Sequence, residues 1–169
     1  MRKVVIDMDL SRESIRAGVK QLREFKKWLT TKEHELLVRL GEEGFQEARV
    51  MFNYAMVFYN NGQGGVDADI TVEERRNRYT IRAHGQDVCF IEFGAGITYG
   101  KGYPAPRPDG IVGIGEYGKK HGKWRNGWWY KDASGTAVRT LGNPPAAGMY
   151  GATQAIRQKV YQIAVEVFG

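Results

Sequence analysis

The prolines and glycines of this chain are unevenly distributed, and their distribution constrains the fold more than any other feature. All five prolines lie between positions 104 and 145, and 14 of the 22 glycines lie between Gly94 and Gly151. Proline fixes the backbone angle φ and removes an N–H donor, whereas glycine widens the allowed angles. Residues 94–126 therefore predict one long irregular loop, and regular structure must come from the segments on either side.

The same segment carries most of the surplus charge. The formal net charge is +6, from 25 basic and 19 acidic residues, and residues 94–131 alone hold seven basic and two acidic residues. A length of 169 residues with 42% hydrophobic residues suits a single folded domain over 1–169 and argues against general disorder. The single cysteine excludes an internal disulfide framework. No apolar run is long enough for a membrane span, and Asp7 and Asp9 stand where a signal peptide would be apolar, so we expect a protein made and folded in a reducing cytoplasm.

Before the loop, the pattern predicts a short strand and two helices. Residues 3–8 are rich in Val and Ile and favour a strand. Ser11 is a candidate N-cap for a first helix, whose apolar stripe is Ile15, Val19, Leu22 and Leu29. The segment Thr30–Glu33 resembles a capping box and predicts the start of a second, longer helix that ends before the Asn- and Gly-rich residues 60–65.

Alternating apolar residues then predict strands. Residues 68–74 and 78–84 alternate, and residues 88–93 are almost continuously apolar, which together predict an antiparallel meander. After the loop, residues 127–131 and 137–141 predict a second hairpin. A last helix has the stripe Ala152, Ile156, Val160, Ile163 and Val167. The predicted class is α+β, with two N-terminal helices and a C-terminal helix packed on a mainly antiparallel sheet, plus a long Gly/Pro-rich basic loop.

No group of residues in the sequence predicts catalysis. Residues 113–118 match the dinucleotide fingerprint G-x-G-x-x-G, but no helix is expected after them, so the match is attributed to chance. Adjacent Glu73 and Glu74 would point to opposite faces of a strand. Cys89 is expected to be a small core residue, and the three histidines lack ligand spacing. We predict no catalytic residue, no cofactor, no metal site and no enzymatic activity.

Basic and aromatic side chains alternate between Lys119 and Lys131. Such a segment can form a protein interface, can bind single-stranded nucleic acid by charge and stacking, or can simply bury one tryptophan beside solvated lysines. We favour the interface. The candidate interface residues are Tyr99, Tyr103, Lys119, Lys120, Lys123, Trp124, Arg125, Trp128, Trp129 and Tyr130.

One part of this segment has a second likeness. Residues 127–135 resemble a single choline-binding repeat of surface proteins, with Trp128, Trp129 and a turn glycine. Those modules need several tandem copies to build their aromatic sites, and one copy is present here. A secreted choline- or carbohydrate-binding module is therefore the third-ranked function, and we interpret the likeness as a shared hairpin.

Three segments together resemble the HK97 gene-10-like family of tailed-phage proteins. Residues 91–96, Ile-Glu-Phe-Gly-Ala-Gly, are similar to the family's "VEFGTG". Trp128-Trp129-Tyr130 and residues 140–146 resemble its hairpin and the "G-x-P-A" segment that follows it, and Met149-Tyr150 resembles the entry to its last helix. About twenty positions, spread over most of residues 10–168, carry the resemblance.

The resemblance implies a structural virion protein of the phage neck, a tail-completion or head–tail joining component. Such proteins form rings around the channel through which DNA leaves the capsid, and the expected ring is a hexamer or a dodecamer. The implied partners are neighbouring neck or connector, tail-terminator, tube or sheath proteins, with DNA passing through the lumen without sequence recognition and with no membrane. The implied location is the virion neck or tail, after assembly in the cytoplasm of the host bacterium.

Two expectations follow for the loop. Residues 97–126 are expected to be poorly ordered in the free subunit and to become ordered on assembly. Lys119, Lys120, Lys123 and Arg125 are expected to face an acidic ring in preference to DNA, because strong phosphate contacts would slow the sliding of a duplex. The competing function is a nucleic-acid-binding accessory protein that uses residues 119–131.

Overall fold

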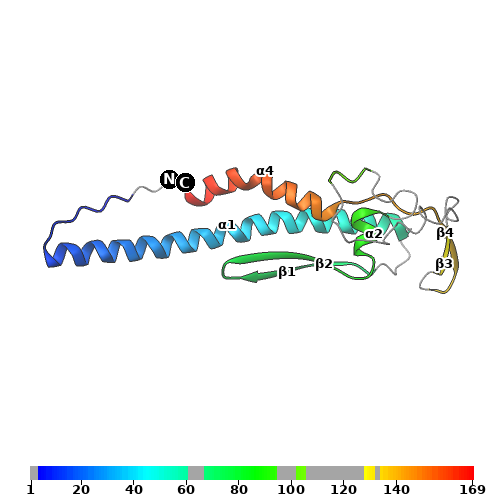
Figure 1. Cartoon of the computed structure of the whole chain (residues 1–169), viewed down its shortest axis with the longest axis horizontal. Coiled ribbons are helices and arrows are strands. Elements are labelled where there is room, and N and C mark those ends of the chain that lie inside the picture. Colours follow the sequence, from blue (N-terminus) through cyan, green and yellow to red (C-terminus); the bar gives the residue numbers. More distant parts are fainter. Residues whose placement is uncertain (1–3, 61–66, 95–101, 106–127, 132–133) are drawn as a thin grey trace.

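The computed structural model describes residues 4–60, 67–94, 102–105, 128–131 and 134–169, with the backbone alone for 57–60, 128, 130 and 131 (Figure 1). Its elements are α1 (Arg12–Asn60), β1 (Asp69–Arg75), β2 (Arg78–His84), α2 (Val88–Phe93), β3 (Trp128–Lys131), β4 (Ala137–Thr140) and α4 (Gly148–Phe168). Strands β1 and β2 pair antiparallel, as do β3 and β4. The predicted α+β class is confirmed. Of the predicted loop, Gly94 and residues 102–105 are described, and the rest lies outside the described residues.

The prediction of two N-terminal helices is wrong, because α1 runs unbroken for 49 residues. Ser11 does cap its start, since its hydroxyl oxygen accepts a hydrogen bond from the Ser14 N–H at 3.2 Å. Thr30 and Thr31 do not begin a new helix. Their hydroxyls donate to the carbonyls of Lys26 and Lys27 at 3.0 Å, one turn back in the same helix. With no proline nearby, nothing interrupts the backbone ladder at this point.

Helix α1 is the axis of an elongated molecule, with α4 along one side and the β1–β2 hairpin along another (Figure 1). Two glycines permit this close packing. A Cβ at Gly44 would lie 2.7 Å from Ile156 on α4 and 2.9 Å from Ile81 on β2, and a Cβ at Gly41 would lie 2.1 Å from the Tyr79 ring. Small residues on α1 therefore set how closely both neighbours approach it.

The main core lies near the C-terminal end of α1. Ala48, Phe52 and Ala55 of α1 are fully buried against Ile70, Ile91 and Ala152. Phe52 is the largest fully buried side chain among the described residues, and Gly148 at the start of α4 lies against its ring. This cluster joins α1, β1, α2 and α4 into one packed body.

The β1–β2 hairpin follows the predicted alternation. Ile70 pairs with Ala83, and Val72 pairs with Ile81. All of these except Val72, which is 41% exposed, pack in the core beside α1. The opposite face carries Asp69, Thr71, Glu73, Arg78, Thr80 and Arg82, and Glu73 forms ion pairs with Arg75 and Arg82. The period of two therefore identifies both the strands and their buried face.

The third predicted strand is wrong, because residues 88–93 form the short helix α2. A short segment that is apolar except for Glu92 has no period that separates a buried strand from a buried helix turn. The residues just before it bend the chain: Gly85 has φ +126°, and Asp87 accepts a hydrogen bond from the Ile91 N–H at 3.0 Å. The predicted strand at 3–8 is also absent over 4–8, where the chain is extended and Met8 packs on Gly18 of α1.

The elements predicted after the loop are confirmed. β3 and β4 form the second hairpin, with Trp129 opposite Arg139. In α4, Ala152, Ile163 and Val167 are buried as the stripe predicts, whereas Val160 is 42% exposed.

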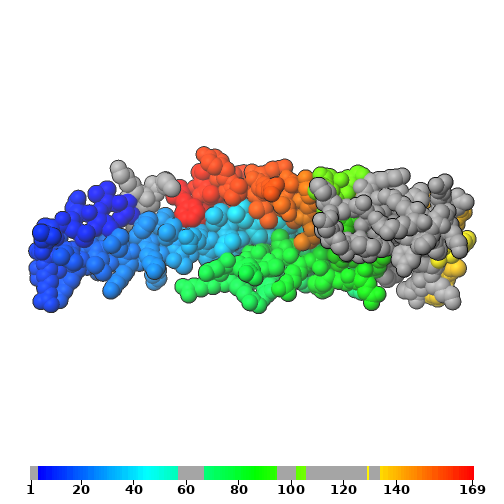
Figure 2. All heavy atoms as spheres, in the orientation of Figure 1, coloured from blue at the N-terminus to red at the C-terminus, as the bar shows by residue number. Residues whose placement is uncertain are grey.

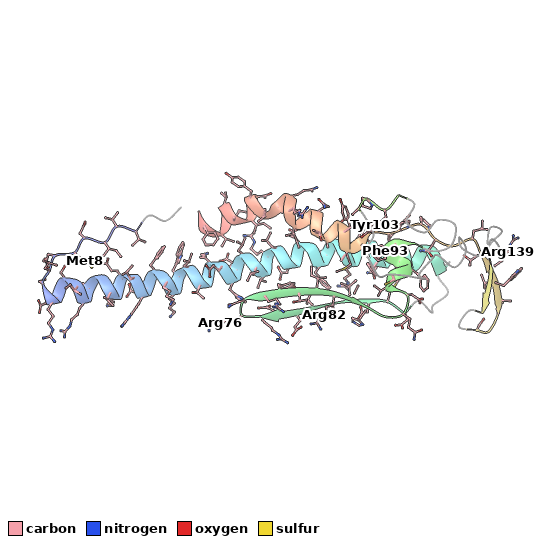
Figure 3. The ribbon with its side chains drawn as sticks, in the orientation of Figure 1. Met8, Arg76, Arg82, Phe93, Tyr103 and Arg139 are labelled. Atoms are coloured by element: carbon pink, nitrogen blue, oxygen red, sulfur yellow. The ribbon has the colours of Figure 1, made fainter. Side chains whose placement is uncertain are left out.

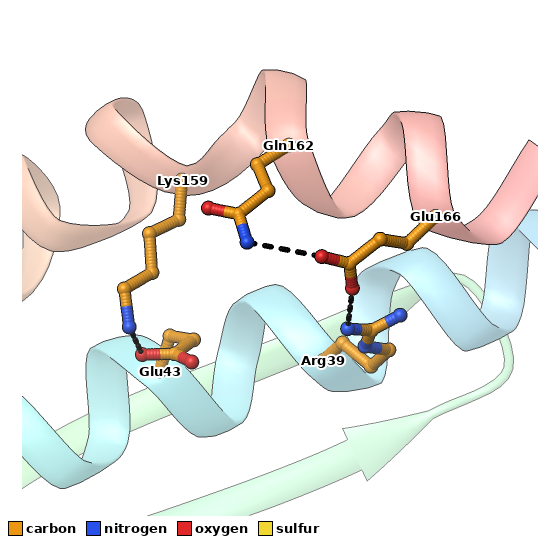
Figure 4. Close-up of polar contacts among 5 residues, drawn as sticks. All are labelled: Arg39, Glu43, Lys159, Gln162 and Glu166. Atoms are coloured by element: carbon orange, nitrogen blue, oxygen red, sulfur yellow. Dashed lines mark hydrogen bonds and ion pairs between the residues drawn. The ribbon is translucent and has the colours of Figure 1, made fainter.

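Ion pairs fasten α4 to α1 outside the core (Figure 4). Arg39 pairs with Glu166, which also accepts a hydrogen bond from Gln162 at 3.0 Å, and Lys159 pairs with Glu43. The Arg39 hydrogen bond, followed by that from Gln162, lowers the pKa of Glu166. Since all of these groups are partly exposed, they fix the register of the helices more than they stabilise the fold.

Candidate functional site

Three separate segments of the chain meet around the carboxyl group of Glu92. Glu92 is 4% exposed and is the one buried charged side chain among the described residues. Its Oε2 accepts the Met149 N–H at 2.9 Å, and its Oε1 accepts the Tyr150 N–H at 3.1 Å and the Tyr103 hydroxyl at 2.9 Å. One side chain thus joins α2, the start of α4 and a residue of the loop. We call Glu92, Phe93, Tyr103, Met149 and Tyr150 the loop anchor.

Glu92 takes the part of an N-cap for α4. The residue before that helix, Ala147, has φ +52° and has no side-chain oxygen to offer. A carboxyl group supplied by α2 accepts the free N–H groups of the first turn and places its negative end at the positive end of the helix dipole. The helix start therefore depends on a residue more than fifty positions earlier in the chain.

The backbone around the anchor is equally specific. Ala146 and Ala147 donate their N–H groups to the carbonyls of Ile91 and Glu92, at 2.8 and 3.2 Å, and the Asn143 amide donates to the Phe90 carbonyl at 2.7 Å. Gly94 has φ +79°, and a Cβ there would lie 2.6 Å from the Asn143 carbonyl oxygen. Only glycine suits that position without moving the backbone.

Tyr103 is the one candidate interface residue from within the loop that the structure describes, and it belongs to the anchor. Its ring contacts Phe93, with centroids 4.9 Å apart, and Tyr150, with centroids 6.0 Å apart (Figure 3). Burial, together with the hydrogen bond to Glu92, raises the pKa of Tyr103 well above its usual range. The hydroxyl therefore stays protonated and donates, which makes Tyr103 a structural tether of the loop.

The other candidates fall into two groups. Trp129 is 66% exposed on β3, and Trp128 and Tyr130 precede and follow it on the same strand. Tyr99, Lys119, Lys120, Lys123, Trp124 and Arg125 lie outside the described residues. The structure therefore separates Tyr103 from Trp129 and does not place the remaining candidates.

A second surface was missed by the sequence analysis, at the other end of the molecule. Residues 12–29 of α1, here called the arm, reach beyond α4 and the hairpin (Figures 1 and 2). Ile15, Val19 and Leu22, predicted to be a buried stripe, are 45%, 40% and 51% exposed. The extended residues 4–10 lie along another face of the arm and leave Leu10 almost fully exposed. Exposed apolar rows of this kind are typical of protein interfaces.

Cations gather beside the arm. A shallow hollow is lined by Arg23, Lys26 and Lys27 of α1 and by Arg76 from the β1–β2 turn, together with Thr30 and Thr31. We call the four cationic residues the basic cluster. The charge count of α1 signals it, since residues 12–32 hold seven basic and two acidic residues while residues 33–60 hold two basic and five acidic.

In the described part of the chain, the candidate nucleophiles and metal ligands do not form a catalytic or metal-binding cluster. Cys89 is half-buried, and burial, followed by the charge of Glu92, raises the pKa of its thiol, which disfavours a reactive thiolate. His34 lies 3.1 Å from Glu74 and His84 lies 3.6 Å from Asp69, as exposed pairs. No group of three or more metal-ligating side chains occurs among the described residues. Within the same residues, no helix combines the length and the apolar character needed to cross a bilayer.

Comparisons with known proteins add no relative to this picture. No family model matches the chain, and neither a curated protein nor a solved structure matches it.

Proposed function

We propose that this chain is a structural subunit of a tailed-phage neck, which assembles as a ring at the head–tail junction and catalyses no reaction. The observation that carries the proposal is the loop anchor. The short segments whose sequences resemble the HK97 gene-10-like family are far apart in the chain, and the structure brings residues 91–94, 143–146 and 149–150 into one hydrogen-bonded unit. Their shared role in holding the loop supports reading the resemblance as one motif.

The shape of the molecule supports an assembly role. A subunit that works by docking needs surfaces its own fold leaves uncovered. This chain has two such surfaces at opposite ends: the arm, with its exposed apolar row, and the β3–β4 hairpin, with exposed Trp129. In a ring, each copy contacts its two neighbours through two different surfaces. The two unlike ends of this elongated subunit can supply those two surfaces.

The proposed partners follow from the same reading. Copies of the chain form the ring, a hexamer or a dodecamer, and adjoining neck, tail-terminator, tube or sheath proteins lie above and below it. The basic loop is proposed to face an acidic partner surface. The competing function, a nucleic-acid-binding accessory protein, would use residues 119–131 and would bind short single strands in a salt-sensitive way.

The test is genetic and structural. The coding sequence is deleted from the genome that carries it, particles are produced, and they are imaged by electron microscopy, with the wild-type gene supplied in trans as the control. We expect filled heads and separate tails without the chain, and joined particles with it, in which the chain lies between head and tail. Joined, infectious particles that lack the chain would overturn the proposal, and so would turnover of a substrate by the purified protein.

A further inference from the structure

Charge is unevenly distributed along the β1–β2 hairpin: cations lie at its turn, and carboxylates lie at its open end. The turn carries Arg76, which completes the basic cluster with three residues of α1 (Figure 3). The open end carries Asp67, Asp69 and Asp87, here called the acidic base. There Asp87 accepts the Asp67 N–H at 2.9 Å, and Asp67 accepts the Gln86 N–H at 3.0 Å.

The basic cluster has no ion-pair partner among the described residues. Arg23, Lys26, Lys27 and Arg76 are all exposed, and none of them makes an ion pair within the described part of the chain. The two threonines of the hollow already donate to carbonyls of α1. Four cations from two elements therefore surround one hollow, and an anionic surface would relieve their mutual repulsion.

The apolar row beside the cluster indicates what kind of surface this is. At 100° per residue, Ile15, Val19 and Leu22 lie on one face of the arm, and Arg16 and Arg23 lie on the face next to it. A phosphate backbone offers nothing to exposed isoleucine, valine and leucine side chains, whereas an acidic protein surface with apolar groups complements both rows. The acidic base also has an exposed apolar side chain beside it. Phe90 lies one turn after Asp87, the N-cap of α2, and is 38% exposed.

We propose that the arm and basic cluster of one copy dock on the acidic base of a second copy, head to tail. This inference rests on the proposed ring and names its contact surfaces. The two surfaces cannot meet within one chain, because strands of seven residues separate them by about 20 Å. A contact between two different patches is heterologous, so each copy retains a free patch and the contact repeats until a ring closes.

The experiment measures self-association of the full chain by sedimentation velocity over a range of concentrations. At low salt, ~50 mM, we expect weak association that grows with concentration, and at ~500 mM salt we expect it to weaken, since screening acts on exposed charges. Lys26→Glu/Lys27→Glu and, separately, Asp69→Lys should each lower the association constant at least about tenfold. Arg157→Glu, a charge reversal at an exposed α4 position, is the matched control and should associate like the wild type.

Mixing gives the decisive result. The Lys26→Glu/Lys27→Glu chain keeps an intact acidic base, and the Asp69→Lys chain keeps an intact arm and basic cluster. An equimolar mixture should therefore form the wild-type contact, between the arm of one variant and the base of the other, that neither variant forms alone. All of these substitutions lie at exposed positions, and thermal unfolding checks that each variant folds. Recovery on mixing would not arise from a general loss of stability.

Three results would overturn the proposal: no concentration-dependent association of the wild type at low salt, reversals that leave association unchanged, or no recovery in the mixture. Salt-sensitive binding of a short duplex DNA that Lys26→Glu/Lys27→Glu abolishes, with copies that stay monomeric, would assign the cluster to DNA and also overturn it. Failure of the neck function is seen separately. If the variants assemble normally into particles, the contact is refuted and the neck function stands. If the chain associates through these surfaces and is absent from particles, the contact stands and the neck function is refuted.

Discussion

The two halves of α1 carry similar amphipathic patterns and differ in what covers them. In the half from residue 33 onward, α4 packs on one side and the β1–β2 hairpin on another, and Ala48, Phe52 and Ala55 are fully buried. In the arm, residues 12–29, a comparable apolar row is exposed, because α4 and the hairpin reach only the C-terminal end of the arm. There Trp28 contacts Phe168, and Arg76 shares a hollow with Lys27. Helical periodicity thus predicts which residues share a face, and the rest of the chain decides whether anything covers that face.

The largest effect is expected in the covered half. Phe52→Ala removes a fully buried ring and leaves a cavity among α1, Ile91 and α4, so it should lower the free energy of unfolding by about 3–5 kcal/mol. Urea denaturation followed by circular dichroism measures the change. Leu22→Ala is the counterpart in the arm and should change stability by no more than about 0.5 kcal/mol. Equal losses for the two variants would mean that the arm is covered in the free chain.

The next effect is expected at the loop anchor. Glu92→Gln keeps the shape of the side chain but replaces one carboxyl oxygen with an amide NH2 group. At least one of the three donors, from Tyr103, Met149 and Tyr150, then faces another donor. We expect a loss of about 2–3 kcal/mol, because a buried donor is left unpaired. Thermal unfolding measures this loss of stability. The control is Gln154→Glu on α4, which makes the reverse exchange of amide for carboxylate outside the anchor. A Glu92→Gln chain as stable as the wild type would contradict the role given to the anchor.

Two glycines give opposite predictions in the two halves of the helix. At Gly41 the new Cβ meets the Tyr79 ring, so Gly41→Ala should push the hairpin away and cost about 1–3 kcal/mol. At Gly18 it meets the flexible end of Met8 on the exposed N-terminal segment. Gly18→Ala should therefore stabilise the chain by up to about 1 kcal/mol through helix propensity. Denaturation midpoints of the two variants compare them directly, and a loss at Gly18 as large as that at Gly41 would refute the comparison.

The smallest effect concerns the exposed ion pair between α1 and α4. The pKa of Glu166 is lowered in the folded chain by Arg39, so the stability that it contributes is present at neutral pH and is lost as pH falls through the folded value, below the ordinary 4.5. Arg39→Gln should therefore be slightly less stable than the wild type at pH 7, and the two should converge as the pH falls below the folded pKa of Glu166. Unfolding midpoints measured across this range test it. A difference that grows on acidification would have the wrong sign.

The sequence predicted those elements whose evidence is local. The structure confirms the strands at 68–74 and 78–84, the Ser11 cap and, apart from Val160, the stripe of the last helix. All of these depend on neighbours within a turn or a strand. The break at Thr30 was wrong because threonine hydroxyls can bond back within a helix as well as cap a new one. The strand predicted at 88–93 was wrong because the conformation of this segment depends on contacts far away in the chain. Glu92 accepts the backbone N–H groups at the start of α4.

The candidate site was predictable in part. The resemblance motifs marked residues 91–96, 140–146 and 149–150, but no local signal says that they meet, since Glu92 and Met149 are brought together only by the tertiary fold. The charge excess of residues 12–32 was visible in the sequence, but its significance depends on the arm being uncovered. Of the basic loop, the described residues place Tyr103 alone among the interface candidates, and its predicted ordering on assembly stays a prediction.

Hydrogen exchange along α1 tests the central claim, that the arm is a docking surface left open in the free chain. Exchange is measured by mass spectrometry on dilute free chain and on chain within assembled particles, and residues 16–29 are compared with residues 33–56. We expect the arm amides to exchange at least about tenfold faster than those of the covered half in the free chain, and to become protected in the assembly. Equal protection of the two halves in the free monomer, or an arm that stays unprotected after assembly, would contradict the account.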